Sequence, residues 1–123
     1  MNPLLLITCL LFSNYCNAQF SSKKIKKELV KVNDSLYASI FEVSNAQFKE
    51  FLSSTWLKEH PQYKSIAFVD SARWISEAAY CEPYVMHYFQ HPAYANYPVV
   101  NISHKVAEVF CEWLTFEYNL NQK

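Results

Sequence analysis

Glycine is absent from all 123 residues of this chain, although a typical chain of this length contains about nine. Glycine lets a backbone turn tightly or approach a phosphate group closely, so its absence restricts the loops that the chain can form. Three kinds of site are therefore excluded: the Walker phosphate loop, the G-x-G-x-x-G dinucleotide-binding turn and the G-x-S-x-G nucleophile elbow.

The size and charge of the chain limit its organisation and its partners. A mass of 14.5 kDa is enough for one domain. Lys and Arg number 11, and Asp and Glu number 11, so the balanced charge gives no electrostatic case for a nucleic acid or an anionic membrane surface as partner. Hydrophobic residues make up 51% of the chain, which argues for a folded protein and against disorder.

Residues 1–18 have the pattern of a signal peptide. The apolar run at residues 4–12 (LLLITCLLF) is too short to span a bilayer but has the length of a signal-peptide core. Cys16 and Ala18 supply small residues at positions −3 and −1 of a cleavage site before Gln19. We therefore expect export to the periplasm or cell envelope. One alternative is a buried N-terminal strand or helix. Another is lipidation of Cys16, but the bulky Tyr15 stands before it, where lipoprotein processing requires a small residue.

Residues 19–35 are expected to form a solvated basic tether. They contain five lysines: Lys23, Lys24, Lys26, Lys27 and Lys31. Contact of these lysines with phosphate or lipid headgroups is the alternative.

Removal of the leader leaves two cysteines, Cys81 and Cys111. An exported chain can join them in one disulfide, which closes a loop of about 30 residues. The alternative is two buried free thiols, because Cys111 lies in an apolar helical run where a cysteine is usually buried and inert.

Regular elements are expected at both ends of the mature chain. Residues 36–43 (LYASIFEV) predict a strand that is largely buried on both faces. Ser44 and Gln47 form a capping box, which predicts a helix with an apolar stripe of Phe48, Phe51, Leu52 and Thr55. His60-Pro61 ends that helix.

A second strand and a second helix are expected near the C-terminus. Residues 98–102 (PVVNI) predict a short buried strand, and Ser103 can cap a helix that runs to about Tyr118. The helix is so apolar that we expect it to need cover on most of its circumference. Between the two predicted helices, residues 62–97 have no clear period but many aromatic side chains, which favours an irregular segment held in place by buried rings.

Three kinds of chemistry were weighed and none is favoured. His87 and His91 have the i, i+4 spacing of a metal-binding pair, but Pro92 disfavours a helix there, so they are expected to be structural or surface histidines. A cysteine nucleophile paired with a histidine lacks an activating context. Carboxylate pairs for hydrolysis can be drawn from Asp70, Glu77 and Glu82, but spacing alone does not select any of them.

Several motifs in order resemble a known family. They are FEVSNAQF at residues 41–48, HPAY at 91–94, YPVVNIS at 97–103 and the helix with FCEWL at 110–114. This order is similar to the N-terminal part of the formylglycine-generating enzyme, or sulfatase-modifying factor, domain over residues 36–118. The stretch from Asp70-Ser71 to Trp74, with Tyr88-Phe89 ahead of His91-Pro92, narrows the resemblance to the gliding-motility lipoprotein branch of that family. The matching positions are Glu42, Asn45, Trp74, His91, Pro92, Tyr94, Pro98, Ala107, Cys111 and Trp113.

The resemblance implies a fold and limits the chemistry. It implies an α+β fold related to C-type-lectin-like domains, with short strands, two main helices and long irregular segments, of which residues 36–123 are the N-terminal part. Complete family enzymes oxidise a sulfatase cysteine with copper and oxygen and also hold calcium. Their catalytic cysteines and calcium ligands lie beyond the part matched here, so we expect no catalytic, cofactor-binding or metal residue in this chain. Asn101 stands where the family often has glycine, and His104 where it usually has tryptophan.

The resulting expectation is an exported domain fragment without catalysis of its own. It is a structural or interaction module of cell-envelope and gliding-secretion machinery, in which a protein partner or a missing C-terminal half covers the last helix. The alternative is the N-terminal piece of a complete oxidoreductase or gliding-motility lipoprotein. A third hypothesis is an unrelated exported binding protein whose aromatic segment, including Trp74 and Tyr94, binds peptides or glycans.

Overall fold

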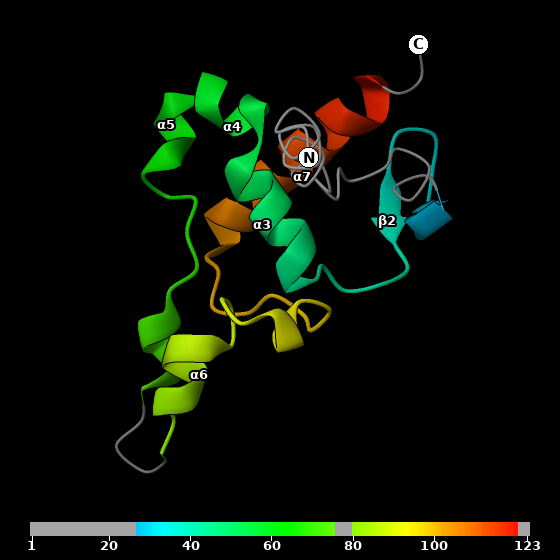
Figure 1. Ribbon diagram of the computed structural model, residues 1–123. Coiled ribbons are helices and arrows are strands. Elements are labelled where there is room, and N and C mark those ends of the chain that lie inside the picture. The colour runs from blue at the N-terminus through cyan, green and yellow to red at the C-terminus, as the bar shows by residue number, and fades with distance from the viewer. Residues whose placement is uncertain (1–26, 76–79, 121–123) are drawn as a thin grey trace, which may run out of the picture.

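The computed structural model describes residues 27–75 and 80–120, and they form a small α+β fold (Figure 1). The expected signal peptide and the lipidation alternative at Cys16 lie outside these residues. The sheet has two antiparallel strands, β1 (Leu29–Lys31) and β2 (Tyr37–Ser39). Five α-helices and two 3-10 helices follow within the described ranges: α3 (Asn45–Ser53), α4 (Thr55–Glu59), α5 (Pro61–Lys64), η1 (Ser71–Trp74), α6 (Glu82–His87), η2 (Pro92–Tyr94) and α7 (His104–Leu120).

The predicted capping box at the start of α3 is confirmed. The backbone N–H of Gln47 donates to Ser44 Oγ (3.2 Å), and the backbone N–H of Ser44 donates to Gln47 Oε1 (2.8 Å). The helix expected from there to His60 is divided in two at Ser54. The backbone of Ser54 is extended, and its hydroxyl accepts from the N–H of Leu57 (3.1 Å) to begin α4. The prediction that helical structure stops at His60-Pro61 holds for α4, because the next helix, α5, starts anew at Pro61.

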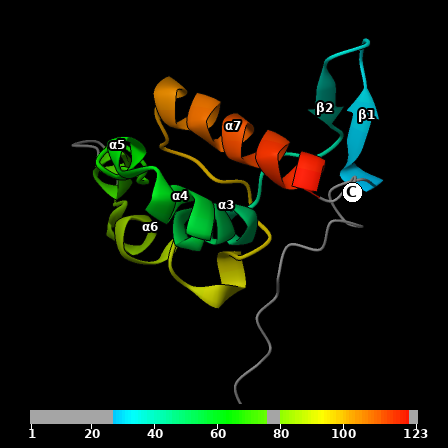
Figure 2. The same ribbon diagram turned by 90° about the horizontal axis from the view of Figure 1, so that it is seen from above.

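The core lies between α3 and α7. Ser103 begins α7 as predicted, since its hydroxyl accepts from the N–H of Val106 (3.2 Å). Phe51 of α3 is fully buried, and its ring lies 5.5 Å from the rings of both Phe110 and Trp113 of α7. Figure 2 shows α7 running alongside α3. The buried core consists of Phe48, Phe51, Trp56, Leu57, Phe89, Val106, Val109, Phe110 and Trp113.

Two strand predictions are corrected. Within residues 36–43 only Tyr37–Ser39 form a strand, and it is exposed rather than buried on both faces because its single partner is β1. That partner, Leu29–Lys31, comes from the segment expected to be a tether. Residues 98–102 form no strand. Pro98 makes one isolated bridge to Ser44, and Asn101 then takes a positive φ of 58° that breaks the extended backbone.

Within the described residues α7 is covered mainly on one side, and the expectation that it needs cover around most of its circumference stays a prediction. Its apolar residues gather on the side that packs on α3, where Val106, Val109, Phe110 and Trp113 are buried. Its outward side carries polar side chains, among them Lys105, Glu108 and Glu112. The exceptions near its C-terminal end are Phe116 and Leu120, which are exposed. In the part of the chain that the structure describes, no helix has the length and apolar character needed to cross a membrane.

Candidate functional site

Five aromatic rings gather on the segment between α5 and α7. Trp74 of η1 lies 5.2 Å from Tyr84 and 5.3 Å from Tyr88, measured between ring centroids. On the other side of Tyr88, the ring of Tyr94 lies at 5.3 Å and that of Tyr97 at 6.4 Å. We call these five residues the aromatic cluster. It consists of two groups of three rings that share Tyr88.

The N-terminus of α3 holds the aromatic cluster in place. Asn45 is fully buried, and its side-chain Nδ2 donates to the carbonyl oxygens of Tyr88 (3.1 Å) and Tyr94 (2.9 Å). The backbone N–H groups of Asn45 and Ala46, which have no partner inside the helix, donate to the carbonyls of Tyr97 and Ala95 (both 2.9 Å). Four hydrogen bonds therefore tie this irregular segment to the core.

Tyr88 is the half-buried centre of the cluster. Its hydroxyl donates to the carbonyl oxygen of Pro98 at 2.9 Å. Desolvation raises the pKa of this phenol, and the nearby Glu42 carboxylate raises the pKa further. Tyr88 therefore stays protonated and keeps donating at neutral pH.

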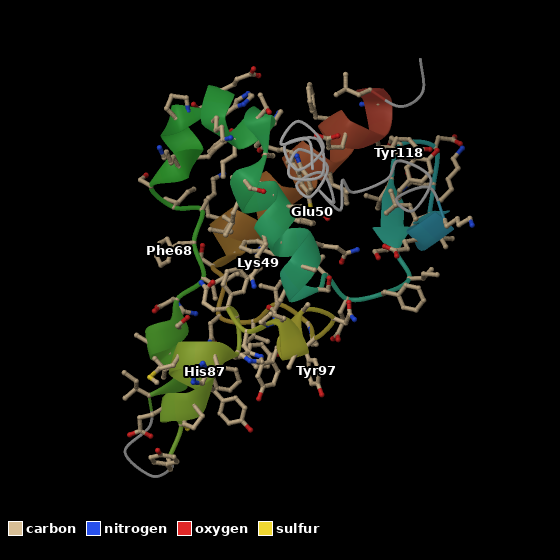
Figure 3. All side chains as sticks on the ribbon, in the orientation of Figure 1. Lys49, Glu50, Phe68, His87, Tyr97 and Tyr118 are labelled. Atoms are coloured by element: carbon tan, nitrogen blue, oxygen red, sulfur yellow. The ribbon has the colours of Figure 1, made fainter. Side chains whose placement is uncertain are left out.

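The ends of the cluster face solvent. Tyr84 is 44% exposed and Tyr97 is 54% exposed, whereas Trp74, Tyr88 and Tyr94 are half-buried. Figure 3 shows Tyr97 on the side of its segment that faces away from α3. Exposed tyrosine and tryptophan rings offer an apolar surface with a polar tip, which is the usual composition of a contact surface for another molecule.

Most rings of the cluster are inclined to one another. The interplanar angle is 56° between Trp74 and Tyr88, 74° between Tyr94 and Tyr97, and 81° between Tyr88 and Tyr97. Trp74 and Tyr84, in contrast, are stacked at 29°. An open hollow of about 310 Å³ is formed by the residues next to Tyr97, with a mixed polar and apolar lining: Glu28, Phe41, Glu42, Ser44, Gln47, Asn96 and Pro98.

The two histidines with metal-like spacing are close, but one of them is already engaged. The ring centroids of His87 and His91 lie 6.2 Å apart. Helix α6 ends at His87, and the backbone N–H of Ala93 donates to Nδ1 of His91 at 3.1 Å. The neutral His91 ring then carries its proton on Nε2, so neither nitrogen offers a lone pair to a cation. Within residues 27–75 and 80–120, no three His, Cys, Asp or Glu side chains are placed to share a metal ion.

The cysteines are not joined. Cys81 is a half-buried free thiol before α6, and Cys111 is a free thiol on the outward side of α7. The disulfide alternative is therefore not realised, and the expectation that Cys111 is buried is wrong. Partial desolvation still raises the pKa of the Cys111 thiol although the residue as a whole is exposed, so this cysteine lacks the low pKa of a reactive nucleophile.

Two of the three carboxylates proposed for hydrolysis, Asp70 and Glu82, lie within the described residues. Asp70 makes an ion pair with Arg73 (3.3 Å) on the same 3-10 turn. Glu82 is an exposed residue of the first turn of α6, and Glu77 lies outside the described residues.

The positions of the family resemblance separate into two groups. Ala107, Cys111 and Trp113 belong to α7. The others surround the N-terminus of α3 and the aromatic cluster: Glu42, Asn45, Trp74, His91, Pro92, Tyr94 and Pro98. The motifs of the sequence include Trp74, Tyr88, Tyr94 and Tyr97 but do not indicate that these rings meet, and Tyr84 belongs to none of the motifs. The high density of tyrosines between residues 80 and 97 is the sequence signal that indicates an aromatic cluster, although it does not predict which rings contact one another.

Comparisons with known proteins identify no relative. No family model matches the chain, and neither the curated proteins nor the solved structures contain a significant match.

Proposed function

We propose that this chain is an exported, non-catalytic interaction module of the cell envelope that binds an extended peptide segment of a partner protein through the aromatic cluster. The observation that carries the proposal is this group of inclined, partly exposed rings, held to the core by Asn45. Crevices between tyrosine and tryptophan rings are the surfaces on which proline-containing peptides dock in the extended polyproline II conformation. A sugar ring would instead stack on a flat aromatic face, so a peptide is the favoured ligand.

The proposed fold is the N-terminal part of a sulfatase-modifying-factor-like domain, and one feature of the backbone supports it. Asn101 has a φ of 58°, in the left-handed region that glycine occupies most easily. The family often has glycine at this position. Asparagine is the residue that best tolerates the same conformation, as this glycine-free chain requires. Membership of gliding-secretion machinery rests on the resemblance alone.

Peptide binding is tested by fluorescence polarisation with a library of labelled proline-containing peptides. We expect saturable binding that weakens at least tenfold in Trp74→Ala and Tyr97→Ala. Phe68→Ala is the matched control, because Phe68 is an exposed aromatic residue outside the cluster. Absence of binding to every peptide, or equal loss in the control, contradicts the proposal, and selective binding to glycans assigns the surface to a sugar ligand instead.

The non-catalytic part of the proposal has a separate test. The purified chain is supplied with copper, oxygen and a cysteine-containing sulfatase peptide, and the peptide mass is followed. We expect no conversion of cysteine to formylglycine. Copper-dependent conversion by this chain contradicts the proposal.

A second candidate is that the chain forms the front of a longer domain. Exposure of Phe116 and Leu120 at the end of α7 favours it, because a following segment is well placed to cover them. The intact mass of the native product in its own cells decides between the candidates. A mass near 12 kDa, expected after removal of residues 1–18 from the 14.5 kDa chain, favours the stand-alone module, and a several-fold larger mass favours the longer domain.

A further inference from the structure

The connection between strands β1 and β2 carries an Asn-x-Ser triplet. Its residues, Asn33, Asp34 and Ser35, are all exposed. Figure 2 shows this connection at the end of the hairpin that lies away from the helices. Asn-x-Ser, where x is not proline, is the acceptor pattern for attachment of a sugar chain to an asparagine amide in exported proteins. The pattern occurs twice in the chain, and the structure separates the two cases.

The side chain of Asn33 uses its oxygen and leaves its nitrogen available. Oδ1 accepts from the backbone N–H groups of Ser35 (3.0 Å) and Leu36 (2.9 Å) and from the hydroxyl of Ser35 (3.4 Å). In the part of the chain that the structure describes, Nδ2 of Asn33 makes no hydrogen bond. The atom that receives a sugar in an asparagine-linked glycan is therefore not engaged by the fold.

The second triplet, Asn101-Ile102-Ser103, is closed to modification. Nδ2 of Asn101 is buried, and the backbone of this residue has a φ of 58°. The hydroxyl of Ser103 accepts from the backbone N–H of Val106 (3.2 Å) at the start of α7. A sugar cannot reach this nitrogen unless the turn before α7 opens. The two copies of one sequence pattern therefore differ in access to the acceptor nitrogen.

We propose that Asn33 is a glycosylation site, at which an asparagine-linked sugar chain is attached to the tip of the hairpin. The sugar donor is a lipid-linked glycosyl pyrophosphate. A bond forms between Nδ2 and the anomeric carbon of the sugar, and the bond from that carbon to the pyrophosphate oxygen breaks. The lipid pyrophosphate leaves with the electron pair, and Nδ2 gives up one proton. The inference rests on the proposed export, because such donors are used on the side of the membrane to which a leader delivers the chain.

The attached sugar leaves the turn intact. The product is still an amide, so Oδ1 of Asn33 continues to accept from the backbone N–H groups of Ser35 and Leu36. The side chain of Asp34 is fully exposed and is paired with Lys31 at 3.2 Å, so it is engaged away from the acceptor amide. The folded hairpin is therefore compatible with the modified residue.

A sugar chain at Asn33 would also shield nearby apolar surface. Val32 and Leu36 flank the triplet, and their exposed fractions are 59% and 53%. Exposed apolar side chains on a short hairpin favour contact with other molecules. A sugar chain is bulky and hydrated, so it keeps such contacts away from the hairpin tip.

The hydroxyl of Ser35 separates modification from a purely structural role of Asn33. Asparagine is common in turns because its side-chain oxygen binds nearby backbone N–H groups. That role requires the backbone N–H of Ser35 but not its hydroxyl. The acceptor pattern, in contrast, requires a hydroxyl at this position. Ser35→Ala therefore keeps the two backbone hydrogen bonds of the turn and removes the acceptor pattern, whereas Ser35→Thr keeps both.

Mass spectrometry of the product from its own cells tests the proposal. The whole 123-residue frame is expressed with its own leader, the intact mass is measured, and the modified peptide is sequenced. We expect a mass above that of the chain without residues 1–18, with the sugar on Asn33. Asn33→Gln and Ser35→Ala should lose the added mass completely, and Ser35→Thr should keep it. Asn96→Gln is the matched control, because Asn96 is exposed but is not followed by the pattern, and it should keep the sugar.

The same mass distinguishes failure of this inference from failure of export. A product that lacks residues 1–18 and carries no sugar overturns the glycosylation site and leaves the proposed export in place. A product that retains residues 1–18 and carries no sugar contradicts both. A sugar found on Ser35 or Asn101 instead, or one that persists in Asn33→Gln or Ser35→Ala, also overturns the assignment to Asn33.

Discussion

Asn45 is the residue that joins the core of this protein to its candidate binding surface. It is the fully buried polar residue among those described, and both donors of its amide reach carbonyls of the aromatic segment. The side-chain oxygen Oδ1 of Asn45 is buried without a hydrogen-bond partner, so the amide is held by its two donor bonds alone.

We predict that Asn45→Ala destabilises the protein and loosens the aromatic cluster. Two hydrogen bonds are lost and two carbonyls are left without this partner, which costs about 1 to 3 kcal/mol of unfolding free energy. Urea denaturation measures the loss. Asn96→Ala, at an exposed asparagine on the same segment, should change the stability little. Equal stability of Asn45→Ala and the unaltered chain contradicts the role assigned to this amide.

Asn101 shows how a chain without glycine makes a turn that favours glycine. Its φ is 58°, and its side-chain Nδ2 is buried without a hydrogen-bond partner. We predict that Asn101→Gly is neutral or stabilising by up to about 1 kcal/mol, because it removes both the strain and the unsatisfied donor. Asn101→Val should cost at least about 1 to 2 kcal/mol, since a β-branched residue fits a positive φ poorly. Thermal unfolding compares the two variants, and a more stable valine variant contradicts the prediction.

At the scale of elements, short helices are held in place by polar contacts with the long helix α7. Tyr63 of α5 lies close to Glu112 of α7, and this carboxylate is the main reason why the pKa of the Tyr63 phenol is raised. The three rings of Trp56, His60 and Tyr63 are stacked, with 4.2 Å between Trp56 and His60. The connection between α4, α5 and α7 therefore depends on a phenol that keeps its proton.

This contact predicts a stability change at high pH. The folded state favours the protonated phenol of Tyr63. The contribution of this contact to the free energy of unfolding is therefore fully present below the unfolded pKa of about 10, and it is lost as pH rises through the higher folded pKa. We expect the difference in unfolding free energy between the unaltered chain and Glu112→Gln to shrink once the pH exceeds the folded pKa of Tyr63. Absorbance titration of the tyrosines should also show Tyr63 ionising at lower pH in Glu112→Gln. An unchanged titration contradicts the contact, and Glu117→Gln on the same helix is the control.

At the scale of the whole molecule, the protein has a firm core and a less buried extension. The core between α3 and α7 contains several side chains that are almost completely buried, among them Phe48, Phe51 and Val109. Helices η1 and α6, which pack on each other, contain no buried residue. Figure 1 shows α6 at the end of the molecule that lies away from α4 and α5.

Hydrogen exchange should therefore separate these two parts. We predict that backbone amides in the middle of α7 exchange only through global unfolding, whereas those of α6 exchange through a local opening of lower free energy. In Asn45→Ala, exchange in α6 and η2 should rise more than exchange in α7. Uniform protection of α6 and α7 contradicts the division into core and extension.

Local interactions explain what could be predicted from the sequence. The capping box of Ser44 and Gln47 and the start of α7 after Ser103 are confirmed. Each depends on residues within about four positions of one another, so the chain specifies them without help from the rest of the fold. The export signal stays a prediction, because it lies outside the described residues.

Long-range contacts decided the rest. The sequence indicates which apolar residues share a face, but only packing determines whether that face is covered. For this reason the strand expected to be buried is exposed, and α7 places Cys111 toward solvent. The aromatic cluster depends on bonds from Asn45 to Tyr88 and Tyr94, which lie 43 and 49 residues away. Periodicity in a sequence has no information about partners so distant, because it records the direction of side chains and not the surfaces that meet them.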